Sequence, residues 1–104
     1  MVDLDEIRAF ARAVGHALRV ERNRRGWTLA ETSLRAGLSL SAQSGMELGV
    51  LPMDMRRLVR LCAVLDVAPA QVITVAQAEA FPLGWPHQHD CCVSNGPPLA
   101  RSGC

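Results

Sequence analysis

The segment of residues 28–49, TLAETSLRAGLSLSAQSGMELG, constrains the fold most, because it holds the signals for two short helices separated by a tight turn. Thr28 is followed three residues later by Glu31, and this capping-box spacing predicts that a helix begins there. Gly37 is expected to end that helix, because the residue after a helix C-terminus often takes a positive φ angle, which glycine adopts without strain. One short helix is therefore predicted between Thr28 and Gly37.

A second helix follows almost directly. Ser39 supplies a side-chain oxygen suited to an N-cap, so the helix is predicted from Leu40 to about Leu48, with Gly49 closing it. Two short helices joined by so tight a turn form a helix-turn-helix pattern. In DNA-binding proteins of this kind, the second helix enters the major groove while the first crosses the DNA backbone.

The flanking sequence adds three more helices to this pair. Apolar residues recur at three- and four-residue steps over residues 3–24, which predicts one long helix. Asp54 is a suitable N-cap for a helix with a wide apolar face, and Pro69 suits the first turn of a fifth helix that reaches Ile73. The chain has only two Trp, two Phe and no Tyr, and this shortage of aromatic residues favours the same all-α class.

These features resemble the lambda repressor/Cro-like (Xre) family. The resemblance covers residues 14–73 and includes the opening run VGHALRVERNRRGWT and the closing run MRRLVRLCAVLDVAP. It implies a compact, all-α, five-helix domain of the lambda-repressor type. Residues 1–13 are then expected to extend the first helix or to form a dimerisation arm. Residues 74–104 are expected to be a mostly disordered C-terminal extension, whose first residues can prolong the fifth helix.

The resemblance also assigns the residues that read DNA bases. Family members use the first, second and sixth residues of the recognition helix, and sometimes the third and fifth. The corresponding residues here are Leu40, Ser41, Ala42, Ser44 and Gly45. Readout of base edges favours Arg, Lys, Asn or Gln, with small apolar groups contacting the thymine methyl. These residues therefore predict modest discrimination, so DNA shape and dimer spacing are expected to contribute.

Other matching positions carry structural roles. Arg22 and Glu47 match a partly buried ion pair that ties the first helix to the end of the third helix in some family members. Gln43 and Thr32 stand where the family buries aliphatic residues, and Ser33 stands where it buries alanine. Polar side chains are therefore expected at three core positions.

The charge distribution suits a phosphate partner. The net charge is only +1, but residues 7–72 contain ten of the eleven arginines and only five acidic residues. Such a basic block is compatible with double-stranded DNA. Phosphate contacts are expected from the N-terminus of the second helix and from nearby arginines, namely Thr28, Leu29, Arg24, Arg25, Arg56 and Arg57. The alternative for each arginine is a solvated surface position.

An apolar cluster indicates a different kind of partner. Leu34, Leu40, Leu48, Val50 and Leu51 fall on or beside the surface that DNA-binding relatives keep polar. Such a cluster is typical of a protein-binding or self-association site, unless the last three residues pack into the loop after the third helix. One hypothesis is therefore a DNA-binding transcriptional regulator, a homodimer that acts as a repressor by promoter occlusion or acts by recruitment. The other is a protein-interaction module, such as an antiactivator or antitoxin-like adaptor, that has lost base readout.

The sequence predicts no enzyme, cofactor or metal site. We find no paired nucleophile and base, no phosphate-binding glycine loop and no paired carboxylates. His87, His89, Cys91 and Cys92 are ligand types, but their spacing does not match structural zinc sites, and Cys62 is expected in the core. No apolar run approaches the ~20 residues of a membrane span, and the N-terminus lacks a signal-peptide pattern, so a cytoplasmic location is expected.

Overall fold

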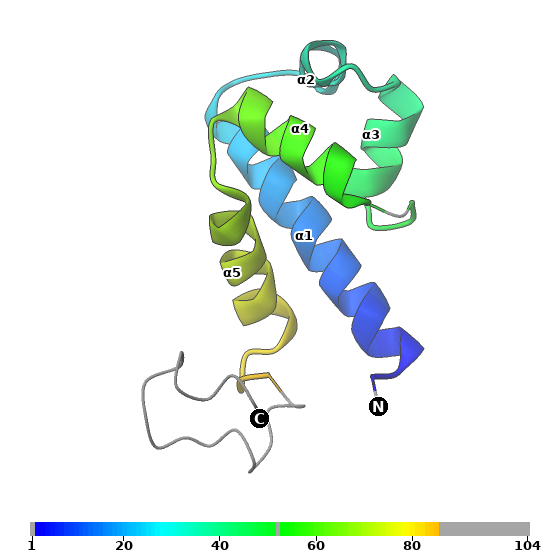
Figure 1. Ribbon diagram of the computed structural model, residues 1–104, viewed down its shortest axis with the longest axis vertical. Helices are drawn as coiled ribbons and strands as arrows, with labels where there is room; N and C mark the ends of the chain where they lie inside the picture. Colours follow the sequence, from blue (N-terminus) through cyan, green and yellow to red (C-terminus); the bar gives the residue numbers. More distant parts are fainter. Residues whose placement is uncertain (1, 52, 86–104) are drawn as a thin grey trace.

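The computed structural model describes residues 2–51 and 53–85, and this part of the chain folds into helices without a strand. The helices are α1 (Leu4–Arg24), α2 (Leu29–Ala36), α3 (Leu40–Glu47), α4 (Met55–Leu65) and α5 (Pro69–Ala80). The long α1 spans the molecule, with α2 and α3 at one end and α5 alongside (Figure 1). The predicted all-α, five-helix architecture is confirmed. The expected disordered tail lies largely outside the described residues.

The helix ends follow the capping residues closely. Thr28 Oγ1 accepts a hydrogen bond from the Glu31 N–H at 3.1 Å, and the Glu31 carboxylate accepts one from the Thr28 N–H at 3.4 Å. Gly37 and Gly49 take φ angles of 72° and 76°, as the ends of α2 and α3 require. Asp66 ends α4 with a φ angle of 55°, which glycine would adopt more readily.

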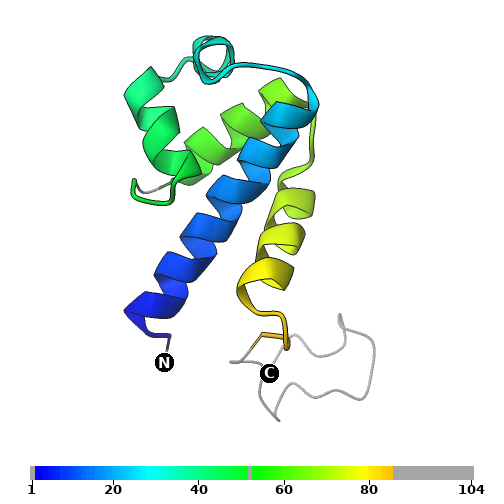
Figure 2. The same ribbon diagram turned by 180° about the vertical axis from the view of Figure 1, so that it is seen from behind.

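The fifth helix continues past Ile73 to Ala80, and aromatic rings tie its far end to α1. The ring of Phe81 stacks on that of Phe10 with 6.3 Å between centroids, and Trp85 meets Phe81 edge-on at 4.8 Å. Seen from behind, α1 and α5 run side by side (Figure 2). The contact with α1 therefore supports the extra turns of α5.

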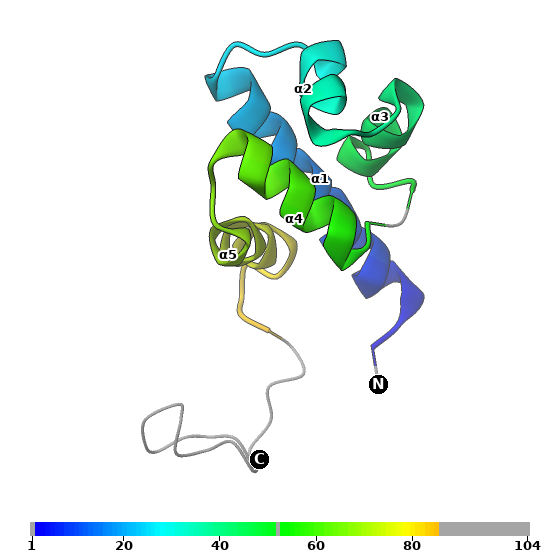
Figure 3. The ribbon, with the colours of Figure 1, turned by 45° about the horizontal axis from the view of Figure 1, so that its top comes forward.

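The core lies between α1 and the helices that pack around it, and α4 lies in front of α1 in Figure 3. Its most deeply buried apolar residues are Ala13, Leu18, Met46, Leu61, Cys62, Leu65, Val72 and Ala76. Gly15 lets α1 approach α3 closely, because a Cβ atom there would collide with the backbone oxygens of Met46 and Glu47. The position of α3 is therefore set by main-chain contact with α1.

Candidate nucleic-acid interface

Helix α3, the predicted recognition helix, has two faces of opposite character. Gln43, Met46 and Glu47 are buried against the rest of the molecule. Leu40 and Leu48, the residue that caps the helix end, are 52% and 56% exposed. Ser41, which is exposed, and Ser44, which is half-buried, lie on the same outward side, because residues three or four apart share a helix face. The outward face of α3 therefore combines leucine and serine, and its one charged residue points inward.

Gly45, one of the predicted base-reading positions, is not on the outward face of α3. It is buried, and a Cβ atom at this position would lie 2.5 Å from Cδ1 of Leu51. The Leu51 side chain thus covers Gly45, so this glycine makes room for a leucine and is poorly placed to contact a base. Leu51 packs on α3 as the loop alternative predicted, whereas Leu48 and Val50 are 56% and 74% exposed.

A buried polar network holds α3 against α1. Arg22 donates from Nε and Nη2 to the two carboxylate oxygens of Glu47, at 2.9 and 3.0 Å, and from Nη1 to the Trp27 carbonyl at 2.9 Å. The side chains of the ion pair are only 12% and 6% exposed. Gln43 Nε2 also donates to Glu47 at 3.1 Å, while Gln43 Oε1 is buried without a hydrogen-bond partner in the described part of the chain.

The other two predicted polar core positions are also buried. Thr32 and Ser33 are 0% and 4% exposed. Each hydroxyl donates to a backbone carbonyl of the preceding turn, Thr32 to Thr28 at 3.0 Å and Ser33 to Ala30 at 3.1 Å. The hydroxyl donors of Thr32 and Ser33 are therefore satisfied by nearby backbone carbonyls. The side-chain carbonyl of Gln43, in contrast, has no hydrogen-bond partner in the described part of the chain.

The arginines expected to contact phosphates lie before α2 and after α3. Arg24 and Arg25 each bond the Glu21 carboxylate at 2.9 Å, and Arg25 also bonds the Glu21 carbonyl at 2.8 Å. The hydrogen bond from Arg25, assisted by the charges of both arginines, holds the pKa of Glu21 below its usual range. Arg56 is exposed and Arg57 half-buried at the start of α4, beside the end of α3 (Figure 1).

The N-terminus of α2 carries an acidic group that the base-reading and phosphate predictions did not include. Glu31 occupies the Thr28 N–H, so its carboxylate lies where a phosphate was expected. The N–H of Leu29 remains among the first-turn donors that have no partner inside a helix. The capping-box spacing itself signals this carboxylate, because the Glu of such a box turns back to the N-cap.

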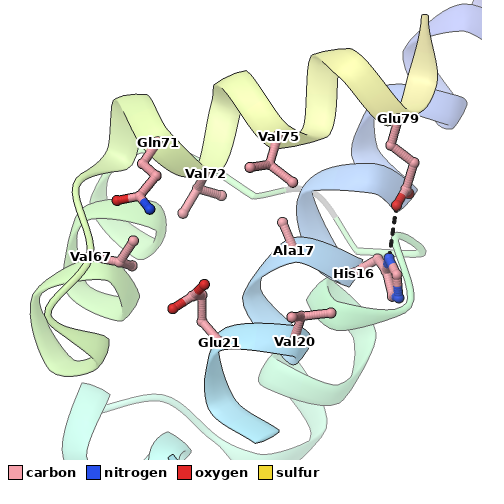
Figure 4. Close-up of a pocket in the computed structure, with 9 residues that line it drawn as sticks. All are labelled: His16, Ala17, Val20, Glu21, Val67, Gln71, Val72, Val75 and Glu79. Carbon is pink, nitrogen blue, oxygen red and sulfur yellow. Dashed lines mark hydrogen bonds and ion pairs between the residues drawn. The ribbon is translucent and has the colours of Figure 1, made fainter. Parts of the chain in front are cut away.

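A groove between α1 and α5 has four valines in its lining, Val20, Val67, Val72 and Val75 (Figure 4). At one end His16 Nδ1 lies 2.9 Å from Glu79 Oε1, which joins the two helices at the surface. None of the nine residues around the groove is a serine, cysteine or lysine. The groove therefore combines apolar contact with polar side chains, of which His16 and Glu79 bridge its two helices and Glu21 and Gln71 line it elsewhere.

The remaining expectations concern metals and membranes. Residues 2–51 and 53–85 contain no group of three His, Cys, Asp or Glu side chains placed to hold a metal ion, and the cluster from His87 to Cys92 lies outside them. Cys62 is buried in the core as predicted, and burial raises the pKa of its thiol. Among the described residues no single helix is long and apolar enough to cross a membrane, although α4 and α5 taken as one bent pair meet both criteria.

Comparison with known proteins gives a similarity to a solved structure of a gene regulator. No family model matches the chain, and no curated protein sequence matches it. The structure is similar to the crystal structure of the clp gene regulator ClgR from C. glutamicum, with a TM-score of 0.62 and 30% sequence identity. The similarity covers 64% of this chain and 87% of the regulator.

Proposed function

Because the chain belongs to the same helix-turn-helix family as the clp gene regulator ClgR, we propose that it is a DNA-binding transcriptional regulator. The observation that carries this proposal is the α2–α3 pair, two capped helices joined at Gly37 on a fold shared with that regulator. We further propose that the chain is of the Xre type, with residues 14–73 as the DNA-binding unit. It would act in the cytoplasm as a homodimer on an inverted repeat, repressing by promoter occlusion.

In this proposal α3 lies in the major groove and the residues around it hold the phosphates. Leu40, Ser41, Ala42 and Ser44 would face base edges, since the N-terminal part of a recognition helix makes those contacts. Phosphates would be bound by the Leu29 N–H and by the arginines on both sides of the motif, Arg24, Arg25, Arg56 and Arg57. The Glu31 carboxylate weakens the attraction of the α2 N-terminus for anions, so the arginines would supply most of it.

The test is binding of the purified protein to random duplex DNA across a salt series. Release of counterions from the phosphates should make the affinity fall steeply as salt rises. Arg56→Ala should reduce the slope of log affinity against log salt by about one, because one phosphate contact is lost. Arg8→Ala is the matched control, since Arg8 is also an exposed arginine but lies near the start of α1, outside α2, α3 and α4, and its slope should equal that of the wild type.

Two outcomes would contradict the proposal. Absence of binding at about 50 mM salt, where non-specific contacts are strong, would exclude DNA as the partner. Equal loss of slope in Arg56→Ala and Arg8→Ala would show that overall charge, and not a surface beside α3, governs the interaction. In the first case the exposed leucines beside α3 would become the surface to test for a protein partner.

A further inference from the structure

The outward face of α3 lacks the side chains that distinguish guanine and adenine. Arg and Lys read guanine, and Asn and Gln read adenine, through paired hydrogen bonds. Helix α3 contains none of the first three types, and its one glutamine, Gln43, is 1% exposed and bonded to Glu47. The serines on the outward face offer hydroxyls, which donate or accept equally well and so discriminate weakly among bases.

Leu40 is the most prominent apolar group at the end of α3 that would reach the bases. It is the first residue of the helix and is 52% exposed, so the core does not require its side chain. Ser39 fixes its backbone, because the Ser39 hydroxyl accepts a hydrogen bond from the Ala42 N–H at 3.0 Å. A leucine on a capped helix start is therefore presented where a recognition helix makes base contacts.

The major groove displays one apolar group, the C5-methyl of thymine. We propose that this protein selects its DNA by thymine methyl groups and that Leu40 is the specificity-determining residue. The inference rests on the proposed DNA binding and adds the class of site, one with thymine at the positions facing the start of α3. Burial of a methyl group against a leucine provides the free energy, because the contact removes apolar surface from water.

The test compares two duplexes of equal length, alternating dA-dT and alternating dA-dU. Uracil keeps the hydrogen-bonding groups of thymine and lacks only its methyl. The wild-type protein should bind the thymine duplex more tightly, by about fourfold for each methyl that is buried. Leu40→Ala should bring the ratio of the two affinities close to one, as measured by competition for a labelled thymine duplex.

Leu48→Ala is the matched control. Leu48 is equally exposed on the same face, but it lies about 12 Å further along the helix, so this variant should keep the wild-type ratio. Both leucines are at the surface, and circular dichroism should show that both variants remain folded.

Equal affinity of the wild type for the two duplexes would overturn the methyl inference and leave DNA binding intact. Absence of binding to either duplex would overturn both proposals. An unchanged ratio in Leu40→Ala would remove the role of Leu40.

Discussion

At the scale of single residues, the network around Glu47 combines a well-satisfied charge with a poorly satisfied amide. The carboxylate of Glu47 receives hydrogen bonds from Arg22 and Gln43. Gln43 Oε1 is buried and accepts no hydrogen bond in the described part of the chain. An unsatisfied buried acceptor costs about 1–3 kcal/mol, whereas a buried charge that loses its partner costs more. The two side chains that bond Glu47 should therefore respond oppositely to replacement by apolar residues.

We expect Gln43→Leu to raise the free energy of unfolding by about 1 kcal/mol, because the orphan carbonyl disappears while Glu47 keeps both bonds from Arg22. Arg22→Met should lower it by about 3–5 kcal/mol, because Glu47 is left buried without a counter-charge. Urea unfolding followed by circular dichroism measures both. A loss of stability in Gln43→Leu would mean that the glutamine contributes more to holding Glu47 than its unpaired oxygen costs.

At the scale of helices, two glycines permit close packing for different reasons. Gly15 in α1 faces backbone atoms of α3, which cannot move without displacing the helix. Gly45 in α3 faces the Leu51 side chain, which is 40% exposed and has room to rotate outward. The two positions therefore form a matched pair, because the added methyl group is the same and only the mobility of its neighbour differs.

Gly15→Ala should lower the free energy of unfolding by about 2 kcal/mol, the usual cost of overpacking, even though alanine favours the helix. Gly45→Ala should be near neutral, because displacement of Leu51 is offset by a gain in helix propensity of up to about 1 kcal/mol. Thermal and urea unfolding of both variants test the contrast. Equal destabilisation would show that Leu51 is held as firmly as the α3 backbone.

At the scale of the whole molecule, the carboxylate of Glu21 pairs with part of the excess positive charge. Glu21 bonds both Arg24 and Arg25, and its pKa in the folded protein is lowered chiefly by the hydrogen bond from Arg25. A lowered pKa means that the folded state binds the proton less readily than the unfolded state. The pair therefore stabilises the fold above the ordinary pKa of glutamate, about 4.3, and this contribution is lost as the pH falls through the lowered pKa of Glu21.

Accordingly, Glu21→Gln should make the free energy of unfolding fall less steeply between about pH 5 and pH 3, a window that brackets the ordinary glutamate pKa. Arg25→Gln should flatten the same part of the curve, because it removes the main cause of the shift. Urea unfolding at a series of pH values gives both curves. A wild-type pH dependence in both variants would show that Glu21 does not take part in the acid response.

The success of the sequence predictions depended on how local each signal was. Caps such as Thr28 and Ser39 act within one turn, so the sequence predicted the starts of α2 and α3 correctly. The contact between Gly45 and the Leu51 side chain joins α3 to the loop that follows it, and no local sequence pattern predicts this contact. The ion pairs of Glu21 could have been predicted from the sequence, because arginines three and four residues later share its helix face.

The main-chain contact at Gly15 has an evolutionary consequence. Since α3 rests on α1 through backbone atoms and through the inward side chains of its own buried face, its outward residues contribute little to its orientation. Mutations at Leu40, Ser41 or Ser44 can then change the outward surface of α3 while the placement of the helix is kept. If α3 binds DNA as proposed, single surface mutations can therefore alter target preference without first passing through unstable intermediates.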